Sequence, residues 1–84
     1  MFYNYPNPFN PTTTISINIV NTLHATSLHI YNISGRCIET MTAGELKPGN
    51  HEFQWNGMYR PSGVYFIKFS TGNSSRTRKM VLLK

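Results

Sequence analysis

The sequence predicts an all-β fold, an antiparallel β-sandwich of six to seven strands. Short segments alternate apolar and polar residues with a period of two, which is typical of strands that bury one face. Turn-forming residues separate these segments at short and regular spacing. Isoleucine, threonine, tyrosine and phenylalanine are frequent, and no segment of the 84 residues has the 3.6-residue period of an amphipathic helix.

The chain begins with a proline-rich, extended lead-in over residues 1–11, and residues 12–84 are predicted to form a single sandwich domain. Three prolines in the lead-in fix the backbone angle φ, remove hydrogen-bond donors and keep their neighbours out of the α region. The lead-in also carries four aromatic residues. We expect these to cap the sandwich or to add a short edge strand: Phe2, Tyr3, Tyr5 and Phe9.

Turn residues separate the predicted strands. Three isoleucines share a face of the first strand, and Ser34-Gly35 joins the second and third strands into a β-hairpin. Residues 42–49 are predicted as a connection because a Lys-Pro-Gly-Asn turn signal ends them. The strands are expected at residues 13–20, 26–33, 36–41, 51–56, 64–70 and 76–84.

The alternation also predicts which side chains form the core. Leu28 and Ile30 are expected to point inward from the second strand. Trp55 alternates in step with Phe53, so both are placed in the core. The alternative for Trp55 is an exposed ring that stacks on a sugar, a role for which Tyr31 and Tyr59 are the better exposed candidates.

The net charge of +5 is concentrated in the last third of the chain. Residues 1–52 carry two basic residues and three glutamates, a sum of −1, whereas residues 53–84 carry six basic residues and no acid, a sum of +6. Such a surface suits an anionic partner, and the alternative is a solvated hairpin face. Nucleic acid is not predicted as the partner, because the patterns of the known single-strand binding modules are missing.

The residues that catalysis or metal binding requires are scarce. The chain has no aspartate, and its acids are Glu39, Glu45 and Glu52, which show no sign of convergence on a cleft. The three histidines lack metal-ligand spacing, and no phosphate-binding glycine motif is present. Cys37, the single cysteine, cannot form an internal disulfide. We therefore predict no enzyme, no catalytic residue, no metal and no cofactor.

No segment has the length of a membrane span, and the first 20 residues lack the features of an export signal peptide. If the protein is exported, we expect its leader to lie upstream of this sequence.

Five segments, in order, carry a resemblance to a known family. They are Tyr5-Pro6-Asn7-Pro8-Phe9-Asn10-Pro11-Thr12-Thr13, Leu28-x-Ile30-Tyr31-Asn32-x-x-Gly35-Arg36, Gly49-x-His51-x-Phe53-x-Trp55-Asn56-Gly57, Ser62-Gly63-Val64-Tyr65-Phe66 and Lys79-Met80-Val81-Leu82-Leu83-Lys84. Together they resemble the C-terminal sorting domain of type IX secretion, the type A class of Bacteroidetes and relatives. The immunoglobulin-like domain of the flagellar hook-capping protein has a similar pattern.

The resemblance implies an immunoglobulin-like sandwich that acts as a non-catalytic sorting signal at the end of a larger exported cargo protein. Its implied partners are the outer-membrane secretion machinery, a surface sortase-like protease, the upstream cargo domain and, after processing, anionic lipopolysaccharide. The implied location is the periplasm in transit and then the cell surface or the medium. Family members often carry aspartate where this chain has Asn32 and Asn56, and asparagine suits the same turns.

The resemblance also implies which residues carry the signal. These are Gly63 and Tyr65 of the Gly-x-Tyr motif and the terminal block of Lys79, Met80, Val81, Leu82, Leu83 and Lys84. The segment of Pro6, Asn7, Pro8 and Phe9 is implied to lie near the cleavage region. A last strand at a sheet edge would offer unpaired backbone groups for strand addition by a receptor. The alternative function is an immunoglobulin-like module that binds carbohydrate or acts as a spacer in a secreted enzyme.

Overall fold

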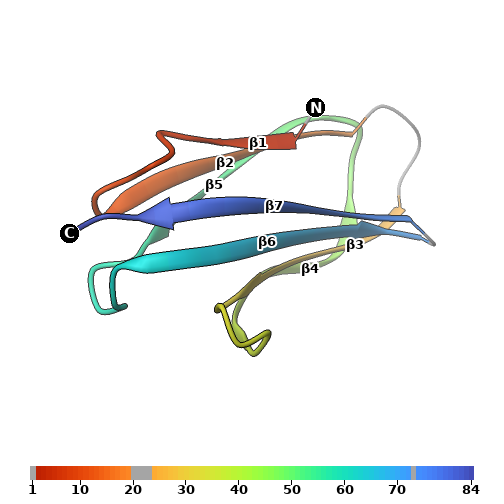
Figure 1. The fold of residues 1–84 in the computed structure, drawn as a ribbon. Coiled ribbons are helices and arrows are strands. Elements are labelled where there is room, and N and C mark those ends of the chain that lie inside the picture. Colours follow the sequence, from red (N-terminus) through yellow and green to blue (C-terminus); the bar gives the residue numbers. More distant parts are fainter. Residues whose placement is uncertain (1, 20–23, 73) are drawn as a thin grey trace.

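The computed structural model describes residues 2–19, 24–72 and 74–84, and it confirms the all-β prediction (Figure 1). Seven antiparallel strands lie in two sheets, and none of these residues belongs to a helix that could cross a membrane. The strands are β1 (Phe2–Tyr5), β2 (Thr12–Ile19), β3 (His24–Tyr31), β4 (Cys37–Leu46), β5 (Gly49–Asn56), β6 (Gly63–Thr71) and β7 (Ser74–Leu82).

The two sheets face each other as an immunoglobulin-like sandwich. One sheet has the order β1-β2-β5 and the other has the order β4-β3-β6-β7. The chain therefore changes sheet between β2 and β3, between β4 and β5, and again between β5 and β6. As a result β1 and β7, from opposite ends of the sequence, are both edge strands, and Asn7, just after β1, hydrogen-bonds to the carbonyl of Lys79 in β7.

The predicted connection over residues 42–49 is wrong for most of its length. Strand β4 continues to Leu46, and β5 already begins at Gly49. Backbone pairing with β3 extends β4, since Thr26 lies opposite Gly44 and His24 lies opposite Leu46. An edge strand of this kind needs no apolar alternation, so the period-two signal fades before the strand ends.

The core fills the space between the sheets with the side chains that alternation predicted. Three isoleucines of β2, together with Leu28, Ile30 and Trp55, are buried. Phe53 was also predicted to lie in the core, but its side chain is only partly buried and packs against the outside of the core cluster. The remaining buried apolar residues are Phe2, Phe9, Tyr65, Ile67, Phe69, Met80 and Leu82.

The lead-in residues take part in this core. β1 pairs with β2, and the ring of Phe2 lies 5.5 Å from that of Phe69 across the sandwich, measured between centroids. Phe9 is buried against Trp55, with 5.7 Å between their ring centroids, and it forms a parallel bridge with Leu82 of the other sheet. Residues 2–9 therefore cross from one sheet to the edge of the other.

Gly57 allows the loop after β5 to approach the end of β7. A Cβ atom at this position would lie only 2.8 Å from Cδ2 of the buried Leu82. The side chain of Asn56 supports the same turn by accepting a hydrogen bond of 2.8 Å from the backbone N–H of Met58. The Asn-Gly pair thus serves both the turn and the close contact.

Candidate recognition site at the C-terminal end of the sandwich

The terminal block divides into core residues and displayed residues. Met80 and Leu82 are fully buried because they point between the sheets. Lys79, Leu83 and Lys84 are exposed, and Val81 is partly exposed. Alternation along the strand explains the division up to Leu82. A partner therefore has access to the side chains of only part of the predicted signal.

The backbone edge of the block is not free, so the expectation of unpaired groups over Lys79–Leu83 is wrong. The N-terminal strap, which we define as residues 7–9, lies along it. The N–H of Phe9 donates to the carbonyl of Val81, and the N–H of Leu83 donates to the carbonyl of Phe9, both over 2.9 Å. Burial of the Phe9 ring holds the strap in this position.

The side chain of Asn7 binds two further backbone groups of this edge. Its Nδ2 donates to the carbonyl of Lys79 over 3.1 Å, and its Oδ1 accepts from the N–H of Val81 over 3.0 Å. One side-chain amide thereby replaces the peptide group of a neighbouring strand. Over the described residues no strand pairs with this edge of β7, so its other end, at residues 74–78, is where strand addition would have room.

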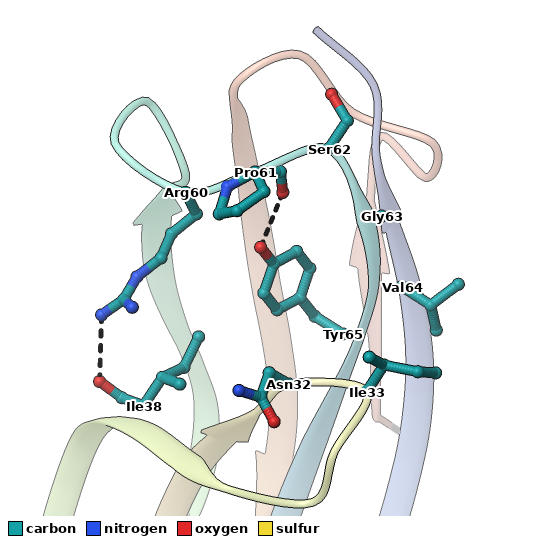
Figure 2. A pocket seen from close by; sticks show the side chains of 9 residues that line it. All are labelled: Asn32, Ile33, Ile38, Arg60, Pro61, Ser62, Gly63, Val64 and Tyr65. Atoms are coloured by element: carbon teal, nitrogen blue, oxygen red, sulfur yellow. Dashed lines mark hydrogen bonds between the residues drawn. The ribbon is translucent and has the colours of Figure 1, made fainter.

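The Gly-x-Tyr motif has a structural role in this fold (Figure 2). Tyr65 is buried, and its hydroxyl donates a hydrogen bond of 2.6 Å to the carbonyl of Pro61. This is the arrangement known as a tyrosine corner in immunoglobulin-like sandwiches. Gly63 has a φ of +151°, which side chains rarely adopt. Both residues therefore shape the loop before β6, and the phenol ring of Tyr65 has little surface to offer a partner.

Replacing Tyr65 by phenylalanine tests this role. The change removes one hydrogen bond and keeps the ring, so we expect the free energy of unfolding to fall by about 1 kcal/mol. Urea denaturation followed by tryptophan fluorescence would measure it, since the ring of Trp55 lies 5.3 Å from that of Tyr65. A stability equal to the parent protein would contradict the structural role.

A shallow pocket lies beside the motif. It has a volume of about 240 Å³ and lies between the β3–β4 turn and the loop that connects β5 to β6. Figure 2 shows Arg60 extending along its rim, where the guanidinium donates to the carbonyl of Ile38 over 3.2 Å. Its lining residues are Asn32, Ile33, Ile38, Arg60, Pro61, Ser62, Gly63, Val64 and Tyr65.

The end of the chain is bound to the same loop. The N–H of Lys84 donates to Oγ of Ser62 over 3.1 Å, and its Nζ donates to the carbonyl of Met58. Gly63 and Tyr65 therefore share a pocket with Asn32 of the distant β3–β4 turn, and Lys84 is bound to Ser62 in the lining of the same pocket. The sequence did not point to Arg60, Met58 or Ile33, because nothing in a local pattern shows which loops meet.

The described residues offer little for catalysis. No group of three or more acidic, histidine or cysteine side chains among them could hold a metal ion. The carboxylate of Glu39 accepts a hydrogen bond of 2.8 Å from Nε1 of Trp55. Sγ of the exposed Cys37 lies 3.7 Å from Nδ1 of His29, whose ring also contacts Thr40. The side chain of Glu45 lies outside the described residues.

The sequence of the chain matches a family model described as a secretion system C-terminal sorting domain, over residues 4–83. This match covers nearly the whole chain. The chain belongs to this family. It is a C-terminal sorting domain of type IX secretion, and proteins with such domains are exported to the cell surface or the medium. The family is in general non-catalytic.

A solved structure shares the fold of this sorting domain. It is that of PorZ, an essential bacterial surface component of the type IX secretion system of Porphyromonas gingivalis. The two chains are 21% identical and superpose with a TM-score of 0.69, over 99% of this chain but only 11% of PorZ. No curated protein matches the sequence. The similarity to PorZ therefore concerns the sandwich architecture alone.

Proposed function

We propose that this sorting domain is read through side chains displayed at the C-terminal end of the sandwich, and not by strand addition along Lys79–Leu83. The observation that carries the proposal is the sealed edge of β7, where the strap occupies the backbone groups of Lys79, Val81 and Leu83. Exposed side chains of the terminal block remain for recognition, namely Lys79, Leu83 and Lys84.

The domain itself is non-catalytic in this proposal and acts for an upstream cargo. The cargo passes through the periplasm, where the secretion machinery of the outer membrane recognises the domain. A surface sortase-like protease cleaves near Pro6, Asn7, Pro8 and Phe9, and the cargo is released or joined to anionic lipopolysaccharide. Cleavage on the upstream side of Asn7 would leave the strap on the domain but separate β1, whose Phe2 belongs to the core, from it.

A fluorescent reporter with an ordinary leader, fused upstream of the domain in a type IX host, tests this function. We expect the triple variant Lys79→Ser, Leu83→Ser and Lys84→Ser to reduce the secreted fraction by roughly tenfold, equivalent to about 1.4 kcal/mol of binding. All three side chains are exposed, so the fold should persist.

The matched control is Arg76→Ser with Arg78→Ser, which removes the same charge from exposed positions farther from the end of β7. This control should be secreted like the parent fusion. A parent fusion that stays in the periplasm would refute the sorting function for this chain, whereas equal secretion of the triple variant would refute the role of the displayed residues.

Carbohydrate binding is the second candidate, and the exposure of Tyr59 favours it. Its ring is 93% exposed on the β5–β6 loop, as a sugar-stacking ring requires. Retardation of the fusion on an insoluble polysaccharide gel, lost in Tyr59→Ser, would support this function. Equal mobility with and without the polysaccharide would exclude it for the polysaccharide used.

A further inference from the structure

Four of the six exposed large hydrophobic side chains among the described residues lie on three segments, the β3–β4 turn, the β5–β6 loop and the end of the chain. The lining of one pocket joins the turn to the loop, and the hydrogen bonds of Lys84 join the loop to the end of the chain. Ile33 is 70% exposed, Met58 50%, Tyr59 93% and Leu83 53%. We call these four residues, together with Arg36, Arg60 and Lys84, the C-terminal platform. Exposed apolar groups collected in one region are typical of protein interaction sites.

The platform is held in place before any partner arrives. Met58 is fixed by the hydrogen bond from its N–H to the Asn56 side chain, and by that from Lys84 Nζ to its carbonyl. On the neighbouring turn, Oδ1 of Asn32 accepts from the N–H groups of Ser34 and Arg36 over 3.0 Å each. A preformed surface loses less conformational entropy on binding than a flexible one.

The charge of the platform indicates the chemistry of its partner. Residues 32–36, 57–63 and 83–84 contain the three basic side chains of the platform and no acidic side chain. The nearest glutamate in sequence, Glu39, lies on β4 outside these three segments, where its carboxylate accepts the hydrogen bond from Trp55. Arginine and lysine around apolar side chains complement carboxylates around apolar side chains.

The direction of β1 bears on the choice of occupant. β1 runs toward the end of the sandwich where the C-terminus lies, so it begins at Phe2 on the side away from that end (Figure 1). A cargo domain joined upstream would enter from that side, which favours the secretion machinery over the cargo as the occupant of the platform.

We infer that the C-terminal platform docks a protein of the outer-membrane secretion machinery that presents apolar side chains flanked by aspartate or glutamate. This inference rests on the proposed sorting function, which already uses the end of the chain, and adds two segments to the recognition surface, the β3–β4 turn and the β5–β6 loop. Tyr59 and Met58 supply the apolar contact, while Arg36, Arg60 and Lys84 set the charge of the partner.

The reporter fusion in the type IX host tests the apolar contact. We expect Met58→Ser with Tyr59→Ser to lower the secreted fraction roughly tenfold or more. The control Tyr3→Ser with Tyr5→Ser removes two exposed rings from β1 and should leave secretion at the parent level. Resistance of the periplasmic fusion to limited proteolysis verifies that both variants fold. Parent-level secretion of the folded Met58/Tyr59 variant would overturn the inference.

A charge reversal tests the acidic partner. Arg36→Glu should lower secretion more than Arg36→Gln, whereas Arg76→Glu, the same change outside the platform, should have no effect. Equal losses from Arg36→Glu and Arg76→Glu would overturn the acidic partner, because only net charge would then matter. If Arg36→Glu loses binding to vesicles that contain anionic lipopolysaccharide and keeps parent-level secretion, the platform contacts lipid and the inference also fails. If the parent fusion is secreted, the sorting function holds, and either of these results refutes only the inference about the platform.

Discussion

Replacing Leu82 by alanine is expected to lower the free energy of unfolding by about 3 kcal/mol, within the range of 2 to 5 for buried leucines. Leu82 is fully buried, contacts the Gly57 loop and bridges to Phe9. For 84 residues the whole stability is of the order of 4–13 kcal/mol. The substitution therefore removes a large share of it, which chemical denaturation of the sorting domain would measure.

Leu83→Ala is the matched control, because it deletes the same side chain at the neighbouring exposed position. We expect a change within about 0.5 kcal/mol. A loss at Leu83 as large as that at Leu82 would show that the ends of β7 and of the chain are not arranged as described.

Because Leu82 lies in the core and Leu83 is exposed, deletion of the terminal block and substitution of its exposed residues should have different effects. Deletion of Lys79–Lys84 removes Met80 and Leu82 from the core, and it should unfold the domain as well as remove any displayed signal. A reporter retained in the periplasm would then reflect loss of folding and could not be attributed to loss of the signal. Substitution of the exposed residues alone separates the two effects.

The alternation of β2 shows why most of the fold could be predicted from sequence. Ile15, Ile17 and Ile19 follow a period that only a half-buried strand produces, and the structure buries all three. The signal is weaker where burial is incomplete. Residues 42–46 form part of β4, an edge strand that depends on backbone pairing with β3. Phe53 lies on β5, an edge strand of the other sheet.

The candidate site could be predicted only in part, because its contacts join distant segments. Asn7 and Val81 are 74 positions apart, and no local pattern shows that a side-chain amide will occupy the edge of β7. The same holds for Ile33 and Arg60, which line one pocket from two different loops. Tyr65 was recognisable as part of a motif, but its hydrogen bond to Pro61 reveals that the motif shapes a loop.

Phe9→Ala is expected to have an effect at least as large as that of Leu82→Ala, a loss of about 3–5 kcal/mol. The ring is buried against Trp55, and it anchors the strap whose backbone seals the end of β7. Loss of the ring should therefore weaken the core and open the edge at the same time. Equilibrium denaturation measures the first effect, and hydrogen exchange at the Val81 and Leu83 amides measures the second.

Asn7→Ala separates the edge from the core. It removes the side-chain amide that bonds Lys79 and Val81, yet it leaves Phe9 in place. We expect a loss of about 1 kcal/mol, faster exchange at Val81 and unchanged protection at Leu83, whose N–H is bound by the carbonyl of Phe9. If Phe9→Ala left both amides as protected as in the parent domain, burial of the ring would not be what holds the strap on this edge.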